Sequence, residues 1–391
     1  MAIPKLRFKD FGEDWTAKKL SQVANLTSSK RVHLSDYVSE GIPFFRGKEI
    51  TELKSGIFPK DILYISKKQY EDFKEKFGAP QNNEILMTAV GTLANTYLIN
   101  TDFEFYFKDG NLIWFKDINA DPNFLMILLD ARKNDVLASA IGSTQKALTI
   151  ANLNKLIFNF PSNEEQIKIT SFLSAVDEKI SQLTQKHQLL SQYKQGMMQK
   201  LFSQQIRFKA DDGSEFEKWE DTTLGKVVNF QNGKRVPLSE SDRQKRQGEY
   251  RYYGASGVID HIDDYVFDGQ YILIGEDGAN IITRSSPLAF IVEGQFWVNN
   301  HAHIFQSKNG SNVFLAAYLE SLNYEKFNSG TAQPKLNLDN LKKVPVINPC
   351  LDEQTKIANF LSAIDQKIEV VAQQIEQTKT WKKGLLQQMF I

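Results

Sequence analysis

The residues best suited to a chemical task in this sequence are clusters of basic side chains. Lysine and arginine bind phosphates and position a protein on a duplex, whereas polar side chains in the grooves read bases. Taken singly, each cluster also fits a solvated surface pair. The candidate DNA-binding residues of basic type are Lys30, Arg31, Arg46, Lys48, Lys67, Lys68, Lys146, Lys234, Arg235, Arg243, Lys245, Arg246, Arg251 and Arg284.

Polar residues follow a glycine at two places that are 188 residues apart. Gly142-Ser143-Thr144-Gln145 recurs as Gly330-Thr331-Ala332-Gln333. The candidate DNA-binding residues of polar type are Thr144, Gln145 and Gln333.

Motifs of catalysis are absent. The sequence contains no G-x-x-x-x-G-K-S/T loop, G-x-G-x-x-G fingerprint, G-x-S-x-G or H-E-x-x-H. His301 and His303 would share one face of a predicted strand, but no third metal ligand is evident. We interpret Cys350 as structural. The sequence therefore predicts a binding protein with no catalytic residue, no metal site and no cofactor of its own.

A segment from the middle of the chain returns at its end. Residues 164–180 and 352–368 agree at 11 of 17 positions without a gap. The same offset places Gly142 on Gly330, Tyr193 on Trp381 and Gly196 on Gly384. Between these matches, over roughly 45–140 and 250–328, the two halves do not align. The chain is thus predicted to be a tandem repeat with similar edges and divergent interiors.

The repeated segments have the 4-3 apolar spacing of long paired helices. Neither contains proline, and acidic residues open both, as suits the helix dipole. His187, Lys194 and Lys382 interrupt the apolar seam along which the helices are predicted to pair. These polar residues either fix the register of the pair or mark places where the pairing frays. Gly196 and Gly384 suggest close approach by the partner helix or by another subunit. The predicted pairing residues are Ile169, Leu173, Val176, Ile180, Leu183, Leu190, Ile357, Leu361, Ile364, Ile368, Val371 and Ile375.

Composition places the chain among multidomain globular proteins. Its 391 residues are 41% hydrophobic, and 47 basic residues balance 47 acidic ones. Because the net charge is zero, a DNA-binding surface must come from local clustering. One cysteine, no signal peptide and no membrane-length apolar run lead us to expect a cytoplasmic protein.

The regions outside the long helices mix strands with short helices. Residues 84–90, 111–115, 271–274 and 296–298 are predicted strands, and 124–132 is a predicted helix. We expect globular domains at 1–162 and 206–350, and long helices at 163–205 and 351–391. The fold class is mixed α+β: two α/β domains separated by a pair of long helices, antiparallel if a pseudo-twofold axis relates the halves.

This organisation resembles the specificity subunits of type I restriction-modification systems. The residues that carry the resemblance are the repeated helix starts, the Tyr193–Phe202 segment, the opening Pro4–Phe8 with Trp15, and the two Gly-Ser/Thr-x-Gln stretches. The resemblance implies that each domain binds one half of a bipartite, asymmetric DNA site. It implies that the helices set the unread spacer and dock two methyltransferase subunits.

The resemblance also implies where the chemistry of the complex resides. S-adenosylmethionine, ATP and Mg²⁺ are expected on partner subunits that methylate adenine or that translocate and cleave DNA. The chain itself is expected to catalyse nothing. Two alternatives stay open: an orphan coiled-coil interaction protein without a role in modification, and an enzyme with a cryptic metal site at His301 and His303.

Overall fold

The computed structural model describes residues 4–143, 145–330 and 333–390. It divides into two compact units. Unit 1 comprises Met1–Leu183 with Gln374–Ile391, and unit 2 comprises Thr184–Gln373. Each unit therefore contains a part of both long helices and one globular part of the chain. No helix in the described residues is long and apolar enough to cross a membrane.

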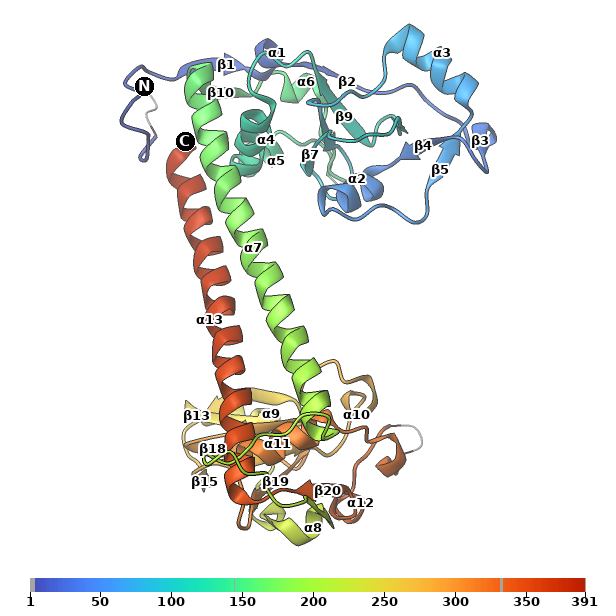
Figure 1. Ribbon diagram of the computed structural model, residues 1–391. Coiled ribbons are helices and arrows are strands. Elements are labelled where there is room, and N and C mark those ends of the chain that lie inside the picture. The colour runs from blue at the N-terminus through green and yellow to red at the C-terminus, as the bar shows by residue number, and fades with distance from the viewer. Residues whose placement is uncertain (1–3, 144, 331–332, 391) are drawn as a thin grey trace. The chain divides into compact units, whose positions relative to one another are not determined.

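The structure contains two long helices, as the 4-3 apolar spacing of the sequence predicts. They are α7 (Asn163–Phe202) and α13 (Leu351–Met389) (Figure 1). Ser162 caps α7, because its Oγ accepts from the backbone N–H of Glu165 at 3.3 Å. Acidic residues occupy the first turn of both helices, where they interact favourably with the helix dipole.

The two helices pair antiparallel. In unit 1 the start of α7 meets the end of α13, where Lys382 Nζ lies 2.5 Å from Asp177 Oδ1. In unit 2 the end of α7 meets the start of α13, where Lys194 Nζ lies 2.6 Å from Asp365 Oδ1. The two lysines that interrupt the apolar seam are thus paired with carboxylates on the opposite helix.

The described residues of unit 1 form three sheets. A two-stranded sheet pairs β1 (Thr16–Lys19) with β10 (Ile157–Phe160). An antiparallel sheet has the order β2-β9-β6-β7, formed by Asn25–Thr27, Leu112–Lys116, Ile85–Thr88 and Thr96–Leu98. A mixed sheet has the order β3-β5-β4-β8, formed by Tyr37–Val38, Leu63–Ile65, Ile42–Phe45 and Tyr106–Phe107. The helices of unit 1 besides α7 and α13 are α1 (Leu20–Val23), η1 (Leu34–Asp36), α2 (Gly47–Lys54), α3 (Lys67–Phe77), α4 (Pro122–Ala131), α5 (Lys133–Ala138) and α6 (Ile150–Leu153).

Unit 2 has a corresponding set of sheets. Its two-stranded sheet pairs β11 (Glu220–Thr223) with β20 (Pro345–Asn348). The second sheet, β12-β19-β16-β17, is formed by Val228–Phe230, Ala302–Ser307, Tyr271–Gly275 and Ala289–Val292. The third, β14-β13-β18-β15, is formed by Gly257–Ile262, Gln247–Gly254, Gln295–Val298 and Phe267–Asp268. The helices of unit 2 besides α7 and α13 are α8 (Leu224–Val227), η2 (Asn232–Lys234), α9 (Glu240–Lys245), α10 (Asn280–Thr283), α11 (Asn312–Ser321), η3 (Glu325–Phe327) and α12 (Leu338–Lys342).

The units share a scaffold that their sequences do not reveal. In the mixed sheets, β5-β4-β8 corresponds to β14-β13-β18, and each set contains one parallel pair, β4 with β8 and β13 with β18. Unit 1 adds β3 next to β5, whereas unit 2 adds β15 next to β18. The divergent interiors are therefore two versions of one fold with different edge strands.

The scaffold contains the strands and the helix that the sequence predicts, and large aromatic side chains pack in its cores. Strands β6, β9, β16 and β18 and helix α4 confirm the predicted strands and helix. Phe44, Phe45, Tyr252 and Tyr253 are all buried, so these aromatic side chains pack in the cores. The cores of the shared scaffold are thus filled by large side chains.

Candidate nucleic-acid interface

We call residues 141–147 the first glycine loop and residues 329–335 the second glycine loop; Thr331 and Ala332 lie outside the residues that the structure describes. Gly142 has φ +108°, and a Cβ there would lie 2.3 Å from the carbonyl oxygen of Gln145. A Cβ on Gly330 would lie 1.7 Å from the carbonyl oxygen of Gln333. Because no side chain fits at such distances, the glycines recur for a steric reason. Thr144 lies outside the described residues.

In unit 1, the first glycine loop is tied to the end of strand β6. Ala89 follows β6, and its carbonyl accepts from the N–H of Leu148 at 2.9 Å. The N–H of Ala89 donates to the carbonyl of Asn111 at 2.8 Å, which ties in the β8–β9 loop. In that loop, Asp109 accepts from Arg31 Nε at 3.0 Å. The strand end thus links the glycine loop to a candidate arginine.

Unit 2 repeats this arrangement at the end of β16. The carbonyl of Glu276 accepts from the N–H of Leu336 at 2.7 Å, and its N–H donates to the carbonyl of His301 at 2.8 Å. Arg235 Nη1 donates to Glu276 Oε2 at 2.9 Å and to the carbonyl of Ala302 at 2.7 Å. We use the term strand-end site for the end of β6 with the first glycine loop, and likewise for the end of β16 with the second glycine loop.

Most candidate arginines are engaged within their own unit. A paired guanidinium keeps further N–H donors, but its position is fixed by the carboxylate. The pairs are Arg31–Asp109 (3.0 Å), Arg46–Glu49 (2.5 Å), Arg235–Glu276 (2.9 Å), Arg243–Asp260 (3.0 Å), Arg246–Asp263 (2.8 Å) and Arg284–Glu320 (2.8 Å).

The remaining basic candidates are exposed and belong to different elements of the two units. Lys30 lies 4.3 Å above the ring of Phe77, at the end of α3. Lys67 and Lys68 lie at the start of α3, about 15 Å along the helix axis from Phe77 at its end. The other exposed candidates are Lys48 on α2, Lys146 in the first glycine loop, Lys234 in η2, Lys245 on α9 and Arg251 on β13.

The histidine pair does not form a metal site in this structure. His301 precedes β19 and is exposed, whereas His303 lies on β19 and is buried. His303 Nε2 donates to the carbonyl of Leu336 at 2.7 Å, and its Nδ1 accepts from Asn232 Nδ2 at 2.8 Å. Burial lowers the pKa of the His303 imidazole. No cluster of three or more His, Cys, Asp or Glu side chains suited to a metal occurs among the described residues.

The repeated Glu-Gln at the helix starts attaches each globular part to its long helix. Glu165 is buried and accepts from Arg7 Nε at 2.7 Å and from Arg7 Nη2 at 2.8 Å. Glu353 is likewise buried and accepts from Arg207 Nε at 3.0 Å and from Arg207 Nη2 at 2.6 Å. These hydrogen bonds raise the pKa of both guanidiniums.

The glutamines beside them have an equivalent role. Gln166 Oε1 accepts from the backbone N–H of Asp121, the N-cap of α4, at 2.9 Å. Gln354 Oε1 accepts from the N–H of Ser311, the N-cap of α11, at 2.9 Å. Sequence reasoning located the Glu-Gln repeat but did not identify these partners. The recurrence of Arg7 as Arg207 was the signal that could have revealed the ion pairs.

The predicted pairing residues are buried or half-buried along both helices. Nine positions are buried, and Ile180, Leu190 and Ile368 are half-buried. A Cβ on Gly196 or Gly384 would meet no described atom within 4 Å. The partner helix therefore does not approach these glycines closely, and approach by another subunit stays a prediction.

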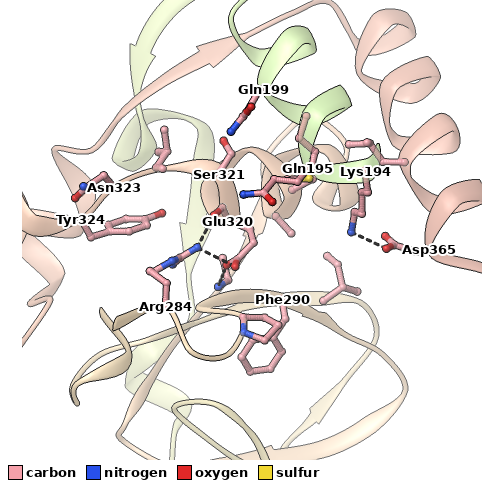
Figure 2. A pocket seen from close by; sticks show the side chains of 18 of the residues that line it. Lys194, Gln195, Gln199, Arg284, Phe290, Glu320, Ser321, Asn323, Tyr324 and Asp365 are labelled. Carbon is pink, nitrogen blue, oxygen red and sulfur yellow. Dashed lines mark hydrogen bonds and ion pairs between the residues drawn. The ribbon is translucent and has the colours of Figure 1, made fainter. Parts of the chain in front are cut away.

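A cavity of 750 Å³ lies within unit 2 between the end of α7, α11 and β17. Figure 2 shows the Lys194–Asp365 and Arg284–Glu320 pairs at its wall. Arg284 has a left-handed backbone, with φ 51°, and its Nη1 is buried without a hydrogen-bond partner among the described residues. The structure thus places this DNA-binding candidate in a pocket wall rather than at the strand-end site.

Comparisons with known proteins point to one family. The family model described as "Type I restriction modification DNA specificity domain" matches residues 12–192 and 216–380. A protein of Haemophilus influenzae, described as a type I restriction enzyme specificity subunit, is 36% identical over 39% of this chain. The match spans only 38% of that relative's length.

Matches over the full length are more distant. The type I restriction enzyme MjaVIII specificity subunit of Methanocaldococcus jannaschii is 24% identical over 89% of this chain and 90% of its own. The crystal structure of a type I restriction-modification system S subunit from M. genitalium superposes with a TM-score of 0.60. It is 19% identical and covers 100% of this chain and 99% of that one, so the fold is shared.

Proposed function

This chain belongs to the type I restriction modification DNA specificity family, and we propose that it selects the DNA sequence in a type I restriction-modification complex. The observation that carries the proposal is the doubled family match over two units with one shared scaffold. Two versions of one reading domain suit a bipartite DNA site whose halves differ in sequence.

We propose that each globular part, 1–162 and 206–350, reads one half-site. The strand-end sites would provide the contact surface, since each unites a basic side chain with an exposed polar loop. Basic side chains would contact phosphates and fix position, while polar groups would read bases. The neutral net charge of the chain is compatible with this role if the partner subunits supply part of the DNA clamp.

The long helices would set the unread spacer. A helix of 40 residues such as α7 is about 60 Å long, comparable with two DNA turns of about 34 Å each. Each domain would cover only a few base pairs, so affinity requires both half-sites to be engaged. A helical connection raises the effective concentration of the second domain once the first has bound.

The helices would also dock two methyltransferase subunits. Tyr193 and Trp381 occupy equivalent positions, and each side chain is 52% exposed. Gly196 and Gly384 lie three residues further, on the same helix face, with open space around them. An exposed aromatic residue beside an accessible backbone suits the approach of another helix. Because the chain carries this patch twice, it suits two copies of one partner.

The chemistry of the complex belongs to the partners in this proposal. The methyltransferase subunits would bind S-adenosylmethionine and methylate adenine, and restriction subunits would use ATP and Mg²⁺ to translocate and cleave DNA. The chain itself is a non-catalytic member of its family. As a subunit that acts on cellular or incoming DNA, it would work in the cytoplasm.

Mapping of N6-methyladenine in cells with and without this chain tests the proposal. We expect methylation at one bipartite motif to be lost when the chain is removed and restored when it is supplied again. An unchanged methylation pattern would refute the proposal and favour the orphan coiled-coil protein.

A further inference from the structure

The repeated residues of the glycine loops have roles within the chain, with one exception. Gly142 and Gly330 recur because a Cβ would collide with the backbone. Leu148 and Leu336 recur because they are buried in the cores. These four residues need no external partner.

The asparagines that follow the loops also have an internal role. Asn152 Nδ2 donates to the carbonyl of Ser139 at 2.9 Å, and Asn340 Nδ2 donates to the carbonyl of Phe327 at 3.0 Å. Each asparagine thus ties the helix after the loop to the segment before it. The scaffold accounts for their recurrence.

Gln145 and Gln333 are the exception. Both side chains are exposed, and neither makes a hydrogen bond, ion pair or ring contact to any described residue. A side chain that recurs in both halves without serving the scaffold has its role outside the chain. The partner must be common to both units, although their interiors have diverged.

The chemistry of the glutamine amide selects among the common partners. Phosphates are bound mainly by lysine and arginine rather than by an uncharged amide. The amide instead matches adenine, because it accepts from the N6 amino group and donates to N7 in the major groove. Adenine is also the base that both half-sites must contain if both are methylated on adenine.

We propose that Gln145 and Gln333 each bind the major-groove edge of an adenine, one in each half-site. This inference rests on the proposed function. The contact is made while the base is stacked in the duplex, before any methyltransferase extrudes it. The two loops would therefore supply a shared adenine contact, while the divergent parts of each unit read the remaining bases.

The experiment uses the assembled complex with its methyltransferase subunits and duplexes of the mapped site. In one half-site at a time, 7-deazaadenine replaces adenine and removes only the N7 acceptor. We expect the wild-type complex to lose roughly five- to hundred-fold in affinity for a substituted half-site, the discrimination of a bidentate pair. With Gln145→Met, one half-site should become insensitive to the substitution while the other stays sensitive.

Gln333→Met should give the reciprocal result. Gln205→Met is the matched control, since Gln205 is exposed and lies outside both loops; it should leave both half-sites sensitive. A wild-type complex that binds the site but ignores 7-deazaadenine would overturn the inference. So would a glutamine variant that weakens assembly with the methyltransferase without changing sensitivity to 7-deazaadenine. If the wild-type complex binds no bipartite site at all, the proposed function itself fails.

Discussion

Removal of the Arg207 side chain should destabilise the protein more than the loss of an exposed ion pair does. Glu353 is 0% exposed, and its carboxylate accepts two hydrogen bonds from Arg207 and one from Trp219 Nε1 at 2.6 Å. In Arg207→Ala the buried carboxylate would keep only the indole. A buried charge that loses its partner costs about 3–5 kcal/mol. Glu353 lies in the first turn of α13, where the helix dipole offsets up to about 1 kcal/mol, so we expect a loss of about 3 kcal/mol.

Urea denaturation followed by circular dichroism measures this loss in the free energy of unfolding. The matched control is Lys356→Ala, one helical turn further along α13. Lys356 pairs with Asp211 at 2.6 Å, but Asp211 is 96% exposed, so this pair should contribute less than about 1 kcal/mol.

A double variant separates the ion pair from the buried charge. Arg207→Met with Glu353→Gln removes both charges and keeps an acceptor for Trp219. It should recover most of the stability, because an apolar or neutral replacement of a buried pair is often nearly neutral. If Arg207→Ala costs no more than Lys356→Ala, or if the double variant is less stable than Arg207→Ala, the reasoning is wrong.

Three further predictions concern other parts of the chain. Because burial lowers the pKa of His303, the unfolded chain binds a proton at this residue more readily than the folded chain does. The free energy of unfolding should therefore be highest above about pH 6.5, the pKa of histidine in an unfolded chain, and should fall as the pH drops below that value. His303→Gln should flatten this part of the profile when urea denaturation is repeated at each pH. Gly330→Ala should cost roughly 1–3 kcal/mol and weaken binding at one half-site in a DNA titration, since its Cβ would meet the Gln333 carbonyl; wild-type stability and binding would contradict the steric argument. Insertion of one helical turn in both α7 and α13 should lengthen the spacer in the methylation motif without changing either half-site. Altered half-sites would refute the proposal that the helices set the spacer.

The long helices could be predicted from the sequence because their determinants are local. Apolar spacing, the absence of proline and acidic first turns identify α7 and α13. The partner of each seam lysine could not be predicted, since Asp177 and Asp365 are brought to Lys382 and Lys194 only by antiparallel pairing. Contacts between residues 171 and 205 positions apart leave no local pattern.

The candidate site was predictable only in part. Runs of basic residues and the recurring glutamines are visible in the sequence, and they led to the candidates at the strand-end sites. Whether a given arginine is available depends on its neighbours: Arg284 lies in a pocket wall with Glu320, and Arg235 is held by Glu276. Burial and ion pairing are properties of the packed chain, so charge clusters alone could not distinguish these cases.

The sequence by itself determined the duplication, the two long helices and the family, because these depend on residue identity and regular spacing. Only the tertiary structure decided that the unalignable interiors form one scaffold. Strand pairing is set by backbone hydrogen bonds and by the burial of large side chains, and many sequences satisfy both. The structure also decided why the shared residues recur: Glu165 and Glu353 attach the globular parts, and the glycines shape the loops. That left Gln145 and Gln333 as shared residues whose side chains make no polar contact to any other residue that the structure describes.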